Sequence, residues 1–387
     1  MNKMLKRGFT ISAIALALLG CSSEEDNVVM APVPEVESQF TPTTDWTASI
    51  GDGVGHYFSK LSPAYDYDKI YVASRDGEVK AIDPENGDTL WEQDLGEDEP
   101  ARLSGGVTVS YDKVIVASEN GQVYALSTED GSVLWQKAID GEVLSKPLVD
   151  ESLVMLHTSK GSLVALKEAT GDQAWKIDSD VPNLTLRGDS SPASVAGGVF
   201  WGMANGRLAA AIIARGQLLW QQPIGTPTGS TEIDRLVDID ASPLIIDSNL
   251  FSVGYNGQLV GLDLRSGTPM WKRKFSSATD LGTDGSQLFV VTDKDHISAV
   301  DSRSGTLLWD NDKLENRQLT KPVMIGGYLV VGDAEGYLHW MDPYTGDFVA
   351  QQLVDEEGIA TAPLEVDDGY LVVTRDGDIK KMEIPLE

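Results

Sequence analysis

Hydrophobic and polar positions alternate along most of the chain in short runs, and glycine-containing corners separate the runs. Lys69–Ser74 and Glu78–Asp83 form one such pair, joined by Asp76-Gly77. Alternation with a period of two is typical of β-strands, and Asp-Gly supplies the positive φ that a tight hairpin turn needs. The pattern therefore predicts antiparallel hairpins along most of the chain.

The hairpin pattern recurs at a regular interval. One copy reads ASRDGEVKAIDPENGDTLW and ends at Trp91, and the next reads ASENGQVYALSTEDGSVLW and ends at Trp135. Seven intervals lie between the marker glycines Gly77 and Gly377, so the mean period is about 43 residues, which is typical of four-stranded propeller blades. The sequence predicts an all-β fold, an eight-bladed β-propeller of four-stranded antiparallel blades.

Tryptophan occupies one position of the repeat. The eighth copy has only a few residues after Gly377 and lacks its own outer strand, whereas the segment around Trp46 precedes the first full copy. We expect this N-terminal segment to close the ring as the missing outer strand, because pairing protects an exposed edge. An aromatic position in every blade indicates docking between blades rather than a stacking platform for bases or sugars. The predicted docking residues are Trp46, Trp91, Trp135, Trp175, Trp220, Trp271 and Trp309.

The N-terminal region lies outside the repeat. Positive charges at Lys3, Lys6 and Arg7 precede an apolar run that is too short to cross a membrane as a helix, the layout of a secretory signal peptide. An acidic, proline-containing stretch without periodicity follows, as is typical of a flexible tether. We therefore divide the chain into a signal peptide (1–20), a tether that begins at Cys21 (21–44) and a propeller (45–387).

The signal peptide ends in Leu18-Leu19-Gly20-Cys21, which resembles the lipobox of bacterial lipoproteins. In that motif cleavage precedes the cysteine, whose thiol is then lipidated. We expect Cys21, the only cysteine of the chain, to carry the lipid, so no disulfide forms within the chain. Ser22 follows where an aspartate would imply inner-membrane retention. The resemblance thus implies lipid anchoring in the outer membrane, on its periplasmic side.

Charge and motif content narrow the function classes. The chain has 60 acidic and 30 basic residues, a formal net charge of −30, so it repels phosphates and we expect no nucleic-acid partner. It lacks a nucleophile elbow, a phosphate-binding loop and a Cys/His pair. The histidines lack metal-ligand spacing, and we predict no metal, cofactor or catalytic site. They are His56, His157, His296 and His339.

The repeat wording Ala-x-Asp-x-x-x-Gly-x-x-x-Trp, here Ala81, Asp83, Gly87 and Trp91, resembles the repeats of quinoprotein-like propellers. Quinoprotein dehydrogenases commonly hold a quinone with calcium and a pair of adjacent cysteines. This chain has one cysteine, so we expect no such cofactor. A quinoprotein-type dehydrogenase remains the enzyme alternative, and a periplasmic ligand-binding propeller that uses the central channel remains another.

Signal peptide, lipobox, acidic tether and eight blades together resemble the propeller lipoproteins of the outer-membrane β-barrel assembly machinery. The most specific stretches are 183–188, 229–236 and 331–340. The resemblance implies a scaffold that binds the periplasmic domains of the barrel-inserting subunit and assists folding and insertion of β-barrel proteins. By motif, it implies partner-binding roles for Leu184, Leu186, Arg187, Asp238 and Asp240.

Connection lengths indicate the same region independently. The proline that begins the next blade lies 12 residues after Trp135, but 17 residues after Trp175 and 23 residues after Trp220. The two longer connections flank one blade, so we expect neighbouring loops on one face of the ring.

Within these loops we expect the two leucines, Leu184 and Leu186, to be apolar anchors surrounded by a rim of charged residues. The sequence leaves open that both leucines instead cover their own blade. It also leaves open whether unfolded barrel clients bind blade edges by strand addition.

Overall fold

A computed structural model describes residues 28–384, except residues 56, 58, 98, 228 and 229. The predicted signal peptide and Cys21 lie outside the described residues. Within them the only helical turn is the short η1 (Ile213–Arg215), and no helix is long and apolar enough to cross a membrane.

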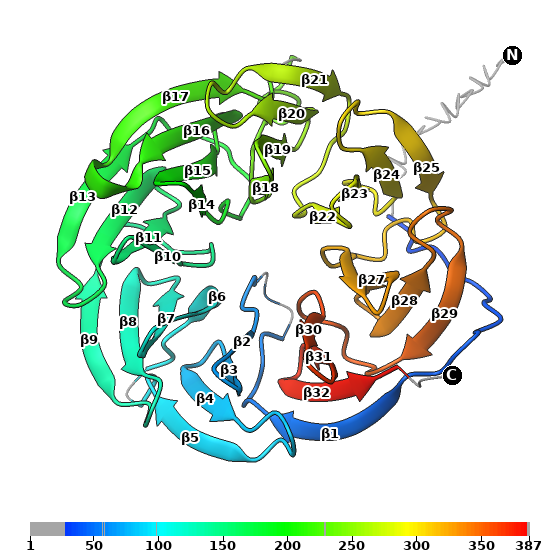
Figure 1. Ribbon diagram of the computed structural model, residues 1–387, viewed down its shortest axis with the longest axis horizontal. Helices are drawn as coiled ribbons and strands as arrows, with labels where there is room; N and C mark the ends of the chain where they lie inside the picture. The colour runs from blue at the N-terminus through cyan, green and yellow to red at the C-terminus, as the bar shows by residue number, and fades with distance from the viewer. Residues whose placement is uncertain (1–27, 56, 58, 98, 228–229, 385–387) are drawn as a thin grey trace, which may run out of the picture.

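The strands form eight four-stranded antiparallel sheets arranged as the blades of one ring (Figure 1), which confirms the predicted fold. Blades one to four comprise β2 (Ala64–Asp66), β3 (Lys69–Ala73), β4 (Glu78–Ile82) and β5 (Thr89–Asp94); β6 (Leu103–Ser110), β7 (Lys113–Ser118), β8 (Gln122–Ser127) and β9 (Val133–Ala138); β10 (Leu148–Asp150), β11 (Leu153–His157), β12 (Ser162–Lys167) and β13 (Gln173–Asp178); and β14 (Ala193–Val195), β15 (Gly198–Met203), β16 (Arg207–Ile212) and β17 (Gln217–Pro223). Blades five to eight comprise β18 (Leu244–Ile246), β19 (Asn249–Val253), β20 (Leu259–Asp263) and β21 (Pro269–Arg273); β22 (Gly282–Thr283), β23 (Gln287–Val291), β24 (Ile297–Asp301) and β25 (Leu307–Asn311); β26 (Val323–Ile325), β27 (Tyr328–Gly332), β28 (Tyr337–Met341) and β29 (Phe348–Leu353); and β30 (Leu364–Val366), β31 (Gly369–Val373), β32 (Asp378–Glu383) and β1 (Thr43–Ser49).

Blade eight is built from both ends of the chain. Its strand order is β1-β32-β31-β30, and Trp46 of β1 pairs with Lys381 of β32. The expected closure of the ring by an N-terminal outer strand is therefore confirmed. Pairing across the two chain ends satisfies the backbone groups that β32 would otherwise expose at an open edge.

The core lies between neighbouring blades. Middle strands β3 and β7 bury Tyr71 of blade one and Val116 of blade two in one apolar cluster, together with Trp91 and Leu103. Residues of alternate strand positions point to opposite faces of a blade, so each blade contributes one face to each of two such clusters. Stability is therefore distributed around the ring rather than held in a single centre.

Seven tryptophans each dock one blade on the next. Six of the seven indole N–H groups donate to a backbone carbonyl of the following blade at 2.7–3.1 Å. Each indole also covers a turn glycine: a Cβ on Gly87 would lie 2.8 Å from the Trp46 ring, and Gly87 has a φ of +77°. A side chain fits neither the space nor that backbone conformation, which explains the fixed glycine-to-tryptophan spacing.

Blade seven departs from this arrangement. In blade one the repeated Trp91 on the outer strand pairs with the small Ala81 on the third strand. In blade seven the sizes are exchanged: Trp340 lies on the third strand and Ala350 on the outer strand. Blade eight takes its outer strand, β1, from the N-terminal part of the chain, so among the described residues no turn joins its third and fourth strands for a tryptophan at position 350 to cover. Phe40 packs on Trp340 instead, with ring centroids 5.4 Å apart.

Of the predicted tether, residues 28–42 precede β1 without forming a strand, whereas its last two residues, Thr43 and Thr44, belong to β1. Residues 28–42 bond to blades six and seven: Gln39 N–H donates to the Val349 carbonyl at 2.8 Å and Ala31 N–H to the Glu315 carbonyl at 2.9 Å. We call this segment the strap.

Candidate functional site

The two long connections meet beside blade four, between β13 and β14 and between β17 and β18. Leu186 N–H in the first donates to a carboxylate oxygen of Asp238 in the second at 3.0 Å. Ser190 Oγ donates to the Ala241 carbonyl at 3.2 Å. A Cβ added to Gly188 would lie 2.9 Å from the Asp240 carboxylate, so this carboxylate packs directly against the Gly188 backbone. The structure thus brings together the neighbouring loops that connection length predicted.

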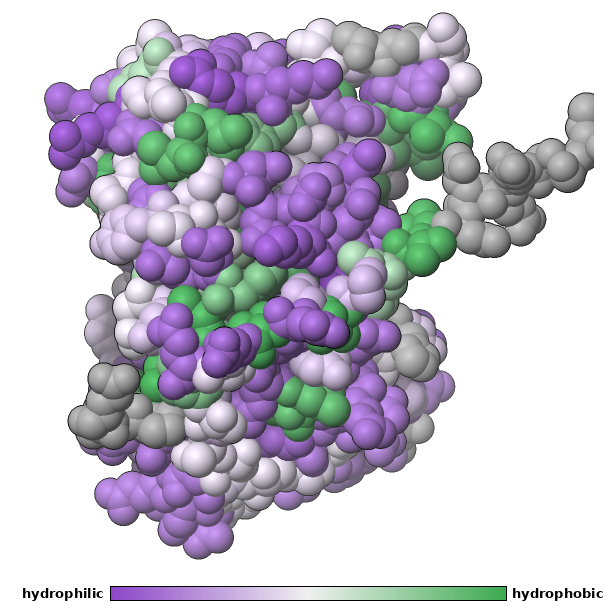
Figure 2. Space-filling model, turned by 90° about the vertical axis from the view of Figure 1, so that its right-hand side faces the viewer, coloured by the Kyte–Doolittle hydropathy of each residue, from purple (hydrophilic) through white to green (hydrophobic). Residues whose placement is uncertain are grey.

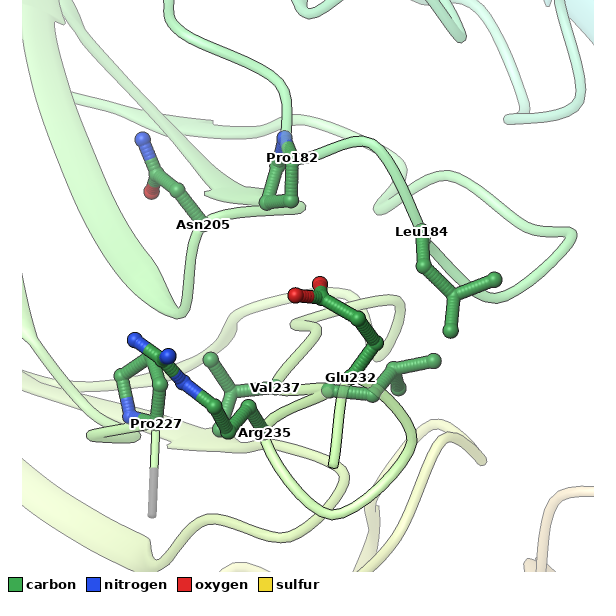
Figure 3. A pocket seen from close by; sticks show the side chains of 8 residues that line it. Pro182, Leu184, Asn205, Pro227, Glu232, Arg235 and Val237 are labelled. Atoms are coloured by element: carbon green, nitrogen blue, oxygen red, sulfur yellow. The ribbon is translucent and has the colours of Figure 1, made fainter. Parts of the chain in front are cut away.

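A cavity of about 250 Å³ opens between these loops (Figure 3). Leu184 forms one side and is 41% exposed, and Pro182 lies next to it. The Glu232 carboxylate points into the opening, with Arg235 on the side away from Leu184 (Figure 3). Ile233, 72% exposed, adds a further apolar side chain on the same connection. An exposed apolar group among charged ones is suited to a protein partner.

A second cavity of about 230 Å³ lies on the other side of the Leu184–Leu186 segment, lined by Leu186, Arg187 and Glu142. Leu186 is half-buried, whereas half of the Arg187 side chain is exposed. The Arg187 guanidinium lies 3.1 Å from a Glu119 carboxylate oxygen and 3.5 Å from Glu142. Glu119 also binds Arg75 at 3.0 Å, so a chain of alternating charges links blades one and two to this loop.

Asp238 and Asp240 do not form the expected charged rim. Their exposed fractions are 2% and 4%, because both carboxyl groups face inward beneath the loop that carries Leu186. The expectation of a rim role was wrong for these two residues, since connection length does not reveal which side chains of a loop turn inward. Instead, both side chains support the exposed loop from below, and Asp238 does so by accepting a hydrogen bond from the Leu186 N–H group.

Burial sets the charge state of these carboxyl groups. Desolvation, followed by the nearby Asp240, raises the pKa of Asp238 to about 8. Burial also raises the pKa of Asp240, against the opposing effect of the Lys60 ammonium, and raises the pKa of Asp189 well above its usual value. His157, buried beside Asp189, has its pKa lowered to about 4 by desolvation and is therefore neutral near neutral pH.

Sequence reasoning missed Lys60 and Asp189. Lys60 Nζ, from the segment that joins blade eight to blade one, donates to the backbone carbonyls of Asp240 at 2.8 Å and Asp189 at 3.2 Å. One ammonium thus ties together the entrances of blades four and five from the far side of the ring. These partners are separated by well over a hundred positions in the chain, so no local pattern indicates the contact.

Within the described residues, one cluster of three carboxylates lies close enough together to hold a metal ion; it is formed by Asp355, Asp376 and Asp378. Lys380 lies 2.7 Å from Asp355 and supplies a positive charge there. His339 binds Asp333 at 2.8 Å within the core of blade seven, and we assign no ligand role to it.

Comparison with known proteins gives concordant results. A family model described as "Outer membrane protein assembly factor BamB" matches residues 75–311 and 293–384. The assembly factor BamB of Vibrio cholerae serotype O1 is 60% identical over 384 residues, covering 99% of this chain and all of that protein.

Solved structures extend the likeness. The crystal structure of BamB from Moraxella catarrhalis superposes with a TM-score of 0.81 at 26% identity, covering 89% of this chain and all of that one. A quinohemoprotein alcohol dehydrogenase from Comamonas testosteroni superposes with a TM-score of 0.72 over 88% of this chain and 76% of its own, but at 14% identity it shares the fold alone. By full-length sequence identity and by family match, the chain belongs to the family of the outer membrane protein assembly factor BamB.

Proposed function

We propose that the protein is a non-enzymatic lipoprotein scaffold of the machinery that assembles β-barrel proteins in the outer membrane. The observation that carries the proposal is the 60% identity to an outer-membrane assembly factor, which extends over 99% of this chain. Identity at this level along the whole ring covers both the blades and the irregular loops beside blade four. The family's assembly role therefore transfers better than the dehydrogenase activity of a protein that shares only the fold.

The scaffold binds the periplasmic domains of the barrel-inserting subunit through the loops beside blade four. Leu184 supplies apolar contact area in the first cavity and Leu186 in the second, where the half-exposed Arg187 adds a positive charge. Apolar anchors commonly dominate the affinity of such surfaces, and charged neighbours set orientation. Asp238 and Asp240 contribute indirectly, because they hold the loop from below.

Lipidation of Cys21 anchors the scaffold at the periplasmic side of the outer membrane. Cys21→Ala removes the acylated thiol, so the variant is expected in the soluble periplasmic fraction or as unprocessed precursor. Fractionation of the envelope with and without detergent measures this. Detergent-dependent membrane association equal to that of the wild type would contradict the anchor.

Co-purification from solubilised envelope tests the partner surface. Leu186→Ala combined with Arg187→Ala is expected to abolish recovery of the barrel-inserting subunit, since truncating a true anchor costs about 2 kcal/mol or more, roughly thirtyfold in affinity. A matched control is Leu308→Ala with Arg303→Ala, an exposed leucine and an exposed arginine on blade six. The control should bind as the wild type does.

Thermal unfolding separates binding from folding. The double variant is expected to melt within a few degrees of the wild type, because both side chains are at least partly exposed. Early unfolding would instead show that these residues pack their own blade, and wild-type recovery of the partner by a folded variant would show that the surface is elsewhere. A quinone absorbance band in the purified protein would contradict the non-enzymatic part of the proposal.

A further inference from the structure

The strap, residues 28–42, is held against blades six and seven by bonds along its length. In Figure 1 it follows the outside of β29 before it enters β1. Asn316 Nδ2 donates to the Val29 carbonyl at 3.0 Å, and Ala31 N–H donates to the Glu315 carbonyl at 2.9 Å. Further along, Ser38 Oγ accepts from Gln351 N–H at 3.1 Å. Contacts thus begin at the first described residues and continue to blade eight.

A buried arginine fixes the N-terminal end of the strap. Arg317 is 1% exposed, and its Nη1 donates to the Ala31 carbonyl at 2.7 Å. Its Nε binds Asp333 at 2.7 Å, and Nη2 binds Glu335. Because the buried guanidinium is paired with the buried Asp333 and the half-exposed Glu335, its direction is set, and Ala31 is held at a defined place beside the connection between blades six and seven.

Phe40 fixes the other end. Its ring centroid lies 5.0 Å from that of Tyr328 and 5.4 Å from that of Trp340, against the apolar cluster of blades seven and eight. The strap is therefore part of the packed ring, and only the residues before Val28 separate the ring from Cys21.

We propose that the side of the ring formed by blades six and seven, where the strap begins, is the side that the propeller turns toward the lipid bilayer. The proposal rests on the lipid anchor at Cys21 proposed above. Seven residues lead from Cys21 to Val28, and they reach at most roughly 25 Å even when fully extended. Without the strap the free segment would continue to Thr43 and reach roughly three times as far.

The chemistry at the start of the strap fits a lipid surface. Val28 and Val29 are 78% and 74% exposed, and Met30 follows them. Figure 2 shows apolar residues projecting where the described chain begins, next to the grey segment. Apolar side chains close to an acyl anchor add contact with the interfacial region, as dual membrane signals do. Glu24, Glu25 and Asp26 disfavour attraction to anionic lipid, so the expected surface is zwitterionic.

This orientation leaves the partner loops accessible. The loops beside blade four are two to three blades around the ring from blades six and seven (Figure 1). The connection β25–β26 that holds the strap and the two partner loops all run from an outer strand to the inner strand of the next blade, so they lie on the same face of the ring. The separation around the ring places the Leu184–Leu186 segment away from the anchored side.

Site-specific fluorescence quenching tests the orientation. Purified acylated protein is bound to phosphatidylethanolamine-containing vesicles that carry a lipid-attached quencher, with a fluorophore on Asp312→Cys or on Ala138→Cys. Both positions are exposed and lie three residues after the repeated tryptophan, in blade six and in the opposite blade two. Quenching is expected to be on the order of twofold stronger at position 312, because the short leash, the seven residues from Cys21 to Val28, holds that side of the ring near the lipid.

A longer leash provides the second variant. Insertion of 20 Gly/Ser residues before Val28 leaves every strap contact in place but raises the average reach of the leash from about 14 to about 28 Å. The difference in quenching between positions 312 and 138 should then shrink, while vesicle binding and melting temperature stay as in the parent.

The outcomes separate the two proposals. Equal quenching at the two positions in acylated protein, or stronger quenching at position 138, overturns the orientation and leaves the anchor intact. A mass without acyl chains on Cys21 in protein recovered from membranes removes the anchor, and with it the orientation. An unchanged difference after the insertion shows that the leash does not set the orientation.

Discussion

The outer ring and the loops beside blade four are stabilised in opposite ways. In the ring one contact is repeated: an indole covers a glycine of the next blade, and in six of seven cases its N–H binds a carbonyl there. Beside blade four each contact occurs once, such as Leu186 N–H on Asp238 and Lys60 Nζ on two carbonyls. Repetition distributes stability evenly, whereas the single contacts shape one surface that differs from the rest of the ring.

The largest expected effect is at the junction that closes the ring. Trp46→Ala removes an aromatic side chain that is 9% exposed and the bond from its indole N–H to the Pro84 carbonyl at 3.0 Å. We expect the free energy of unfolding to fall by about 3–5 kcal/mol. Denaturant unfolding of variant and wild type measures the change. An unchanged midpoint would place Trp46 outside the cooperative core.

Among the loops beside blade four, Asp238 is expected to act on binding through Leu186. Asp238→Ala leaves the Leu186 N–H without its acceptor, and we expect partner affinity to fall about tenfold, by about 1.4 kcal/mol. Asp238→Asn retains an amide oxygen and should restore most of the affinity. Titration of the purified propeller against the periplasmic domains measures both. Equal losses for the two variants would indicate that the charge of Asp238, not its position, matters to the partner.

The same residue gives the loops a pH dependence that the tryptophan junctions lack. Since the pKa of Asp238 is raised from 3.8 to about 8, the folded chain holds more protons than the unfolded chain between these values, and stability falls as pH rises. His157, with its pKa lowered from 6.5 to about 4, acts in the opposite sense, but only below about pH 6.5.

The window from about pH 6.5 to 8 therefore excludes the contribution of His157 and leaves that of the buried carboxyl groups. The free energy of unfolding should fall there by on the order of 1–2 kcal/mol, and Asp238→Asn should flatten this slope. Denaturant unfolding at several pH values measures it, with Trp271→Phe as a variant whose slope should stay that of the wild type. A slope that Asp238→Asn does not alter would assign the titration to Asp189 or Asp240.

The smallest effect separates two junctions within the ring. The Trp271 indole N–H donates to the Ser302 carbonyl at 3.0 Å, whereas that of Trp220 is buried with no partner among the described residues. Replacement by phenylalanine removes a bond only in the first case, so Trp271→Phe should cost about 1 kcal/mol more than Trp220→Phe. Differences in unfolding midpoint give the comparison, and equal costs would assign both docking contacts to ring packing alone.

The sequence by itself determined the architecture, because the architecture is local and repeated. A glycine and a tryptophan at fixed spacing specify a turn and the indole that covers it, and seven copies leave one arrangement that buries all of them. The incomplete eighth copy, together with Trp46, also determined that the ring closes through its N-terminal strand. Adjacency of the two long loops followed from connection length.

Tertiary structure decided what depends on distant residues. Asp238 and Asp240 turn inward beneath a loop that precedes them by about fifty residues. Lys60 bonds across the ring to Asp240, and Arg317 binds the strap, so these contacts also join positions far apart in the chain. No repeat position encodes these contacts, because each occurs once. Burial then decided their chemistry: an aspartate that the sequence presents as a charged residue has its pKa raised to about 8 where desolvation outweighs its hydrogen bond to Leu186.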